Sequence, residues 1–425
     1  MRTISAVFAS FVLATGAQAA PRVATVPASN ITQGNDGLPV LPVKMPAPRA
    51  DGKVVLQLPG GVERETTING ELQTALSAFI ADRGSPIAAV IMADARTGDI
   101  LAMVEGRSPD AWGGNTHTAL HAKFPAASLF KTVATSAAFE IADFDPEKPL
   151  GLSGGCGNVE PSGMWMNDQI VGQNYMTMRR AYGLSCNSFF AKMAINQLGL
   201  GLVHDFARKF GYGQVPAADF KVDAGTLLSP SATTSSSYTV GRFAAGFGMV
   251  TTSAVHVANT MLAIANDGKR IPLRLFKDSP VMNPESKDLK DLMVEPETAR
   301  KIRKIMEATV RGGTASFAFN RGRPRRLREM TGGKTGTLMG RHPVGLTTLF
   351  SGIMPLEKPE VVVATIVVLE DHWIIKAPSL AAEALSTWVD IKEREGVMTT
   401  AGELIRENKS TRYRSQAHRK GEGRS

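Results

Sequence analysis

The chain has 425 residues, of which 43% are hydrophobic, and it carries a formal net charge of +9 at pH 7. This length allows one large domain or two modest ones, and the composition is ordinary for a globular protein. Beyond the first 19 residues no stretch is long and apolar enough to span a bilayer, which excludes a protein with several membrane-spanning segments.

The first residues determine the expected compartment. Met1 and Arg2 form a short basic region, residues 4–14 are mostly apolar, and Ala17-Gln18-Ala19 fits a small-x-small cleavage site. We therefore expect residues 1–19 to be a signal peptide and the mature protein to be exported to the periplasm. The alternative is an uncleaved segment that anchors the chain in the inner membrane, the only case in which membrane contact is expected. An exported chain is not expected to bind nucleic acid, and its oligomeric state is left open.

Residues 20–65 are expected to form a Pro-rich linker with one short strand at 53–58. A single domain is expected over residues 66–395. Asn69 can cap a helix in which Leu72, Leu76, Phe79 and Ile80 fall on one face. Apolar segments at 87–93 and 99–104 predict two strands joined by a Thr-Gly turn.

The middle of the chain is predicted to be mostly helical, with irregular segments at 145–174 and 213–238. Helices are expected over residues 126–141, 177–183, 188–198, 206–212, 253–267 and 296–310. Three strands at 333–338, 347–353 and 361–369 precede a last helix at 378–391. Residues 396–425 are basic and are expected to form a disordered tail.

Strands at both ends of the domain, with helices between them, require the first hairpin to pair with the last three strands. The pattern alone therefore predicts a mixed α and β fold with non-local strand pairing.

The candidate chemistry begins at Ser128, which stands one helical turn before Lys131. Residues three apart on a helix share a face, so the hydroxyl and the amine can meet. A serine hydroxyl needs an adjacent base, and lysine is such a base only when burial or a neighbouring cation lowers its pKa. A four-residue pattern alone is more often part of an ordinary helix, so a catalytic interpretation needs further motifs elsewhere in the chain.

Two partners follow in order: Ser185-Cys186-Asn187, between two predicted helices, and Lys334-Thr335-Gly336-Thr337, in a predicted strand. The three motifs together are the signature set of penicillin-binding proteins and serine β-lactamases. Over residues 66–388 the chain resembles the transpeptidase domain of penicillin-binding proteins, most closely the class without a glycosyltransferase. The resemblance implies an α+β fold: a five-stranded antiparallel sheet flanked by helices, with an inserted, mostly helical subdomain.

The resemblance also implies roles for the motif residues. Ser128 would attack the carbonyl between two D-alanines, or a β-lactam amide, and Lys131 would be its base. Ser185 would relay a proton to the leaving nitrogen, and Asn187 would hold a substrate amide. Lys334 would add positive potential that keeps Lys131 neutral and attracts the substrate carboxylate.

In the third motif, Thr335 and Thr337 would bind the substrate carboxylate, and Gly336 would leave room beside the strand edge. The N–H groups of Ser128 and Thr337 would form the oxyanion hole. Peptidoglycan stem peptides are the implied substrates and β-lactams the implied inhibitors, and neither a cofactor nor a metal is expected.

The leading interpretation is a D,D-transpeptidase, with carboxypeptidase activity if water accepts the acyl group. One alternative is a β-lactamase, for which no correctly placed glutamate is found: Glu65 begins a segment that mimics the required motif but precedes Ser128. The other is a non-catalytic sensor that binds β-lactams or muropeptides in the same pocket.

Three further features of the sequence bear on the site. The sequence leaves open whether Cys156 and Cys186 form a disulfide at the edge of the site or stay free thiols. Residues 151–155 match the nucleophile elbow of α/β-hydrolases around Ser153, but loops are expected on both sides of it. His256, on an apolar helix, is expected to be packed and not to bind a metal.

Overall fold

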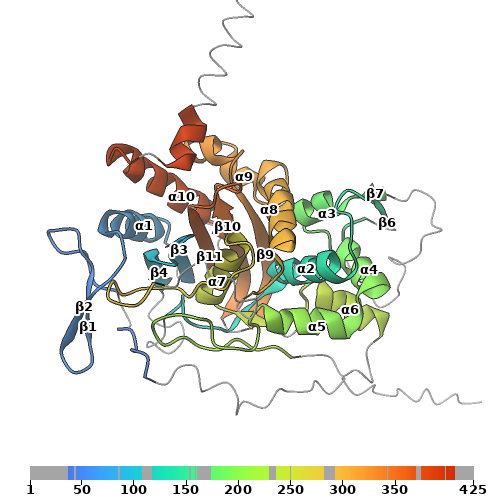
Figure 1. The fold of residues 1–425 in the computed structure, drawn as a ribbon, viewed down its shortest axis with the longest axis horizontal. Helices are drawn as coiled ribbons and strands as arrows, with labels where there is room; N and C mark the ends of the chain where they lie inside the picture. The colour runs from blue at the N-terminus through green and yellow to red at the C-terminus, as the bar shows by residue number, and fades with distance from the viewer. Residues whose placement is uncertain are drawn as a thin grey trace, which may run out of the picture.

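The computed structural model describes residues 37–42, 45–84, 87–107, 117–152, 155–157, 159, 174–228, 236–248, 250–281, 292–341, 343–369, 375–397 and 399–406. Its centre is a five-stranded antiparallel sheet in the order β4-β3-β11-β10-β9 (Figure 1). The strands are β3 (Ile87–Asp94), β4 (Ile100–Arg107), β9 (Gly332–Arg341), β10 (Val344–Met354) and β11 (Val361–Leu369). The first hairpin pairs with the last three strands through β3 and β11. The α+β class and the non-local pairing are confirmed.

Strand β3 is buried on both faces, which explains its unbroken apolar sequence. Ile87 and Ile91 belong to one hydrophobic core cluster, whereas Val90 and Met92 belong to a second. Because successive residues of a strand point to opposite faces, the sheet separates two cores.

Helices cover both faces of the sheet (Figure 1). On one side lie α1 (Gly70–Asp82) and α10 (Ala377–Arg394), which pack on β4, β10 and β11 and on each other. On the other side α7 (Ala254–Ala265) packs against β3, β10 and β11, and α8 (Pro296–Arg311) packs against β9. Helix α1 begins as predicted, because Asn69 Oδ1 accepts a hydrogen bond from Leu72 N at 2.9 Å.

The inserted region is helical, as predicted, and it packs around α2. Its helices are α2 (Lys131–Ile141), α3 (Met178–Leu184), α4 (Asn187–Gln197), α5 (Gly199–Lys209) and α6 (Ser237–Ala244). Short elements complete the domain: β5 (Phe124–Pro125) paired with β8 (Thr251–Thr252), β6 (Leu150–Leu152) paired with β7 (Asn174–Met176), α9 (Ser316–Phe319) and the 3-10 helix η8 (Arg323–Leu327).

Two helix predictions in this region were wrong. Helix α5 covers Gly199–Lys209 instead of residues 206–212, and α6 lies partly in the expected loop at 213–238. Leu198 is both the C-cap of α4 and the N-cap of α5, and the next residue, Gly199, has a left-handed φ of +73°. No helix was predicted over residues 199–205, although α5 begins there directly after Leu198.

Both ends of the domain contain more structure than predicted. The expected linker includes a hairpin of β1 (Val55–Leu58) and β2 (Val62–Glu65), and its Leu41, Val54 and Leu56 join the main core. In the expected tail, residues 400–406 are helical with Ile405 buried. Residues 1–19 and 407–425 lie outside the described part of the chain.

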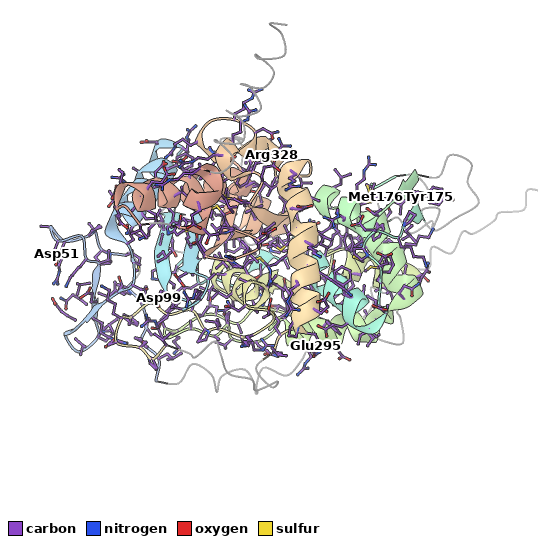
Figure 2. All side chains as sticks on the ribbon, turned by 45° about the horizontal axis from the view of Figure 1, so that its top comes forward. Asp51, Asp99, Tyr175, Met176, Glu295 and Arg328 are labelled. Atoms are coloured by element: carbon purple, nitrogen blue, oxygen red, sulfur yellow. A yellow bond between two sulfur atoms is a disulfide. The ribbon has the colours of Figure 1, made fainter. Side chains whose placement is uncertain are left out.

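Figure 2 shows Asp51, beside this hairpin, and Tyr175, on β7, at opposite ends of the long axis of the molecule. In the part of the chain that the structure describes, no helix has the length and apolar character needed to cross a bilayer.

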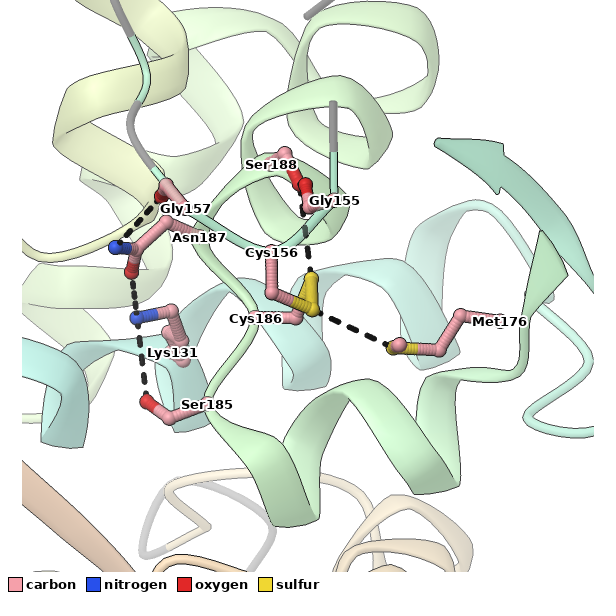
Figure 3. Close-up of a disulfide and its surroundings, with 9 residues drawn as sticks. All are labelled: Lys131, Gly155, Cys156, Gly157, Met176, Ser185, Cys186, Asn187 and Ser188. Atoms are coloured by element: carbon pink, nitrogen blue, oxygen red, sulfur yellow. Dashed lines mark hydrogen bonds between the residues drawn. A yellow bond between two sulfur atoms is a disulfide. The ribbon is translucent and has the colours of Figure 1, made fainter. Parts of the chain in front are cut away.

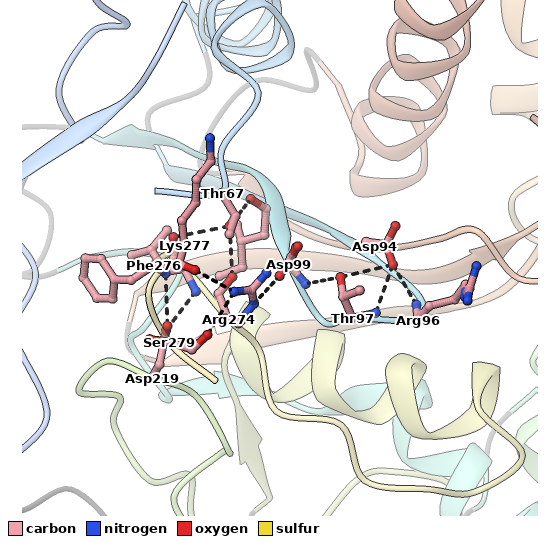
Figure 4. Close-up of polar contacts among 12 residues, drawn as sticks. Thr67, Asp94, Arg96, Thr97, Asp99, Asp219, Arg274, Phe276, Lys277 and Ser279 are labelled. Atoms are coloured by element: carbon pink, nitrogen blue, oxygen red, sulfur yellow. Dashed lines mark hydrogen bonds and ion pairs between the residues drawn. The ribbon is translucent and has the colours of Figure 1, made fainter. Parts of the chain in front are cut away.

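The turn between β3 and β4 is fixed by a polar network (Figure 4). Asp94 Oδ1 accepts hydrogen bonds from the backbone N–H groups of Arg96, at 2.8 Å, and Thr97, at 3.0 Å. Beyond the turn Asp99 forms an ion pair with Arg274, which also donates to the Ser279 carbonyl at 3.0 Å. The network fastens the first hairpin to the segment that follows α7.

Candidate active site

Ser128 lies in a short 3-10 helix, η4 (Ala127–Phe130), that leads directly into α2 at Lys131. Residues three apart eclipse each other in a 3-10 helix, so the two side chains stack along its axis. Lys131 Nζ lies 2.5 Å from Ser128 Oγ. The structure therefore brings the predicted nucleophile into direct contact with the predicted base.

The Lys131 side chain is fully buried. Burial, and after it the charge of Lys334, holds the pKa of Lys131 well below its usual value. Both causes act in this direction because a low dielectric and a like charge each disfavour the ammonium form. A neutral amine has one lone pair, which can accept the proton of the Ser128 hydroxyl, and two N–H groups, which remain donors.

The second motif occupies the junction of α3 and α4. Ser185 ends α3 in the left-handed conformation with φ of 57°, and Asn187 begins α4. Lys131 Nζ donates to Asn187 Oδ1 at 2.7 Å and to Ser185 Oγ at 3.5 Å, so both side chains meet the amine (Figure 3). A left-handed serine is uncommon, and such residues concentrate at functional sites.

Cys186, between these two residues, forms a disulfide with Cys156, and their Cα atoms lie 4.5 Å apart. Of the two possibilities that the sequence left open, the disulfide is therefore correct. It joins the loop at residues 155–157 to the second motif (Figure 3).

The third motif lies on β9, the edge strand of the sheet. Lys334 is fully buried, and burial lowers its pKa to about 7. Its Nζ donates to the Thr335 carbonyl at 3.1 Å and lies 5.4 Å from the centre of the Tyr182 ring. The charge of Lys334 is one of the two causes that lower the pKa of Lys131, so the residue supplies positive potential beside that amine. Thr337 is exposed on the same strand, opposite Thr348 of β10.

Thr314 is a site residue whose role the sequence did not reveal. Its Oγ1 lies 2.5 Å from Thr335 Oγ1, and its backbone N–H donates to the Gly183 carbonyl at 3.0 Å. It therefore links the third motif to α3, two residues before Ser185. No motif or spacing in the sequence singles it out, since Thr314 lies between the predicted helix at 296–310 and the predicted strand at 333–338.

Two glycines lie against the turn that carries Ser128. A Cβ atom at Gly336 would lie 3.4 Å from the Ala126 carbonyl oxygen and from Ala127 Cβ, so β9 runs close to the nucleophile turn. A Cβ atom at Gly246, whose φ is +91°, would lie 2.0 Å from the Ala127 carbonyl oxygen. Ala127 itself has φ of 47°, an uncommon value for alanine, and it immediately precedes Ser128. The backbone at the nucleophile is thus held by close contact on two sides.

The remaining candidates have other roles. His256 is buried, and burial lowers its pKa to about 4. In the neutral ring Nε2 donates to the Phe210 carbonyl at 2.7 Å, and Nδ1 accepts from Thr252 Oγ1 at 2.9 Å. It is packed, as predicted. The Glu65 carboxylate accepts hydrogen bonds from two lysines on the surface. Strand β6 precedes Ser153, contrary to the expected loop, but residues 155–157 form a turn where the hydrolase elbow requires a helix. Ser153 itself lies outside the described residues.

Comparison with known proteins identifies the family to which the chain is similar. The family model described as "Penicillin binding protein transpeptidase domain" matches residues 88–385. Penicillin-binding protein PbpB of Mycobacterium tuberculosis is 28% identical over 275 residues, which are 60% of this chain and 39% of that protein. The probable peptidoglycan D,D-transpeptidase PbpC of Pseudomonas aeruginosa is 24% identical over 308 residues, 70% of this chain and 51% of that protein. The chain thus spans about half the length, or less, of these curated relatives.

Solved structures have the same fold. The D,D-transpeptidase domain of a peptidoglycan glycosyltransferase from Eggerthella lenta superposes with a TM-score of 0.62 at 21% identity, covering 77% of this chain and 82% of that one. Penicillin-binding protein 3 from Mycobacterium tuberculosis, complexed with aztreonam, gives a TM-score of 0.61 at 23% identity, covering 78% of this chain and 79% of the other. The family match over most of the chain, together with this fold, leads to one conclusion: the chain belongs to the family of penicillin-binding protein transpeptidase domains.

Proposed function

We propose that the chain is a serine D,D-transpeptidase that acts on the D-Ala-D-Ala stem peptides of peptidoglycan and is acylated by β-lactams. The observation that carries the proposal is the buried amine of Lys131, 2.5 Å from Ser128 Oγ and in contact with Ser185 and Asn187. The names of relatives support the same activity, since one is a probable peptidoglycan D,D-transpeptidase and one was solved with aztreonam.

In the proposed reaction Ser128 Oγ attacks the carbonyl between the two D-alanines while its proton passes to Lys131 Nζ. The developing oxyanion accepts hydrogen bonds from the N–H groups of Ser128 and Thr337, each worth roughly 3 kcal/mol in such sites. Ser185 then passes a proton to the leaving nitrogen, the C–N bond breaks, and D-alanine departs. An amine from a second stem peptide attacks the ester, which restores the Ser128 hydroxyl and forms the cross-link.

Binding of the substrate carboxylate is assigned to the third motif. Lys334 supplies positive potential from beneath the strand, and the hydroxyls of Thr335 and Thr337 donate hydrogen bonds to the carboxylate. Gly336 leaves the edge of β9 open to the substrate backbone, which would add to the sheet as a further strand. Asn187 would donate to the substrate amide through its side-chain nitrogen.

We further propose that the protein acts in the periplasm after export. The signal-like residues 1–19 support this location. The Cys156–Cys186 disulfide supports it independently, because structural disulfides persist mainly in oxidising compartments.

The test is labelling of the purified protein with a fluorescent penicillin, followed for hours, with Ser128→Ala as the control. A stable adduct that is lost in Ser128→Ala is expected. Rapid release of the label would indicate a β-lactamase instead, and absence of any Ser128-dependent adduct would leave a non-catalytic binding protein. Incubation of a stem pentapeptide with and without an amine acceptor then separates transpeptidase from carboxypeptidase activity.

A further inference from the structure

The start of α4 is hydrogen-bonded to carbonyl groups of the loop at residues 155–157. The first N–H groups of a helix have no partner within the helix, and among the described residues the N-cap, Cys186, makes no side-chain capping bond. The Asn187 N–H donates instead to the Cys156 carbonyl at 3.3 Å, and Ser188 Oγ donates to the Gly155 carbonyl at 2.6 Å. The loop carbonyls thus bind one backbone N–H group and one side chain at the start of α4.

A third carbonyl of this loop contacts a motif side chain. Asn187 Nδ2 donates to the Gly157 carbonyl at 3.3 Å, while Asn187 Oδ1 accepts from Lys131 Nζ at 2.7 Å (Figure 3). The opposite orientation of the amide would place its oxygen against the Gly157 carbonyl and its NH₂ group against the N–H groups of Lys131. Both contacts would then be repulsive, so the Gly157 carbonyl selects the orientation in which the amide oxygen faces the amine.

The disulfide holds this carbonyl in place. Cys156 immediately precedes Gly157, and Cys186 immediately precedes Asn187, so one covalent bond joins the neighbours of the donor and of the acceptor. Glycines on both sides of Cys156 give the loop little rigidity of its own.

We propose that the Cys156–Cys186 disulfide is a positioning device for Asn187: it holds the Gly157 carbonyl against the amide and thereby directs Asn187 Oδ1 to Lys131. The proposal rests on the proposed function, because the step that it serves is acylation of Ser128. With Asn187 oriented, the two N–H groups of neutral Lys131 are directed to Asn187 and Ser185, and the lone pair is left for the Ser128 hydroxyl. Reduction of the disulfide frees the loop, lets the amide turn, and slows acylation without removing any motif residue.

The experiment measures the second-order rate constant for acylation by a fluorescent penicillin. It compares oxidised and reduced wild type, Cys156→Ser/Cys186→Ser, and Asn187→Ala in both redox states, with circular dichroism to count folded molecules. These two are the only cysteines in the chain, so a reductant acts only on this disulfide. Reductant added to Cys156→Ser/Cys186→Ser is therefore the matched control and should change nothing.

Reduction and the double substitution are each expected to lower the wild-type rate constant about tenfold, the usual effect of losing one hydrogen bond to a charged or strongly polarised group. In Asn187→Ala reduction should change the rate less than twofold, because the disulfide acts through the side chain already removed. An equal loss in both backgrounds, or no loss in wild type, would overturn the proposal. So would unfolding of both disulfide-free forms, since the disulfide would then serve the fold. Failure of the oxidised wild type to acylate at all would instead refute the proposed function.

Discussion

Gly246→Ala should slow acylation of Ser128 although it replaces no motif residue. The added Cβ would lie 2.0 Å from the Ala127 carbonyl oxygen and 3.3 Å from Ser128 N, whereas real Cβ contacts are essentially never under 3.0 Å. The two backbones must therefore separate by about 1 Å, and a displacement of that size at a reacting group costs about 100-fold in rate. We expect the second-order rate constant for acylation by a fluorescent penicillin to fall by about that factor, which corresponds to about 2.7 kcal/mol.

The matched control is Gly60→Ala, in the turn between β1 and β2. Gly60 has φ of +85°, close to the +91° of Gly246, but among the described atoms nothing lies within 4 Å of its added Cβ. Both variants incur the cost of a left-handed alanine, about 1 kcal/mol of stability, which thermal denaturation measures. Only Gly246→Ala should lose acylation. Equal acylation rates in the two variants, at equal folded fractions, would refute the argument that this glycine positions Ser128.

Three further predictions follow from the site. Lys334→Met removes a positive charge that lowers the pKa of Lys131, so the pKa of Lys131 should rise. Because acylation needs the neutral amine, the acidic limb of the pH profile of the acylation rate constant should move to higher pH. An acidic limb at the same pH as in the wild type would contradict this prediction. Thr314→Val removes the partner of the Thr335 hydroxyl and should lower the acylation rate constant about fivefold, for about 1 kcal/mol, whereas Thr314→Ser should retain it. Replacing both disulfide cysteines by serine opens a loop of 30-residue separation and should lower the free energy of unfolding by about 3.5 kcal/mol, measured by urea denaturation; a loss below about 1 kcal/mol would argue against it.

The fold could be predicted where local patterns coincide with burial. The apolar segments of β3 and β11 form strands close to the predicted bounds. Asn69 and Ser253 cap the starts of α1 and α7, as predicted. The start of α6 carried a usable signal as well, since Ser236 Oγ accepts from Thr239 N at 3.3 Å, but a run of serines was interpreted as a loop. The local sequence did not reveal the junction at Leu198, which is both the C-cap of α4 and the N-cap of α5.

The sequence predicted which residues form the candidate site but not the contacts between them. The three motifs and their order along the chain identify the candidate residues Ser128, Lys131, Ser185, Asn187 and Lys334. The contact of Thr314 with Thr335 depends instead on how α8 packs against β9, and no local pattern encodes that packing. The disulfide likewise depends on a Cα separation that only the folded chain provides.

The pairing of β3 with β11 has a consequence for how the protein must fold. Ala89 pairs with Ile366, about 275 positions later in the chain, and closing a loop of that length costs about 3 kcal/mol more entropy than closing one of ten residues. Local helices can form early, but β3 lacks one of its two neighbours until β11 (Val361–Leu369) is available. Proteins with such non-local strand pairing fold slowly, and their unpaired strand edges stay exposed until folding is complete. A chain synthesised only as far as residue 360 would therefore present β3 as an open template for aggregation, however complete its catalytic motifs.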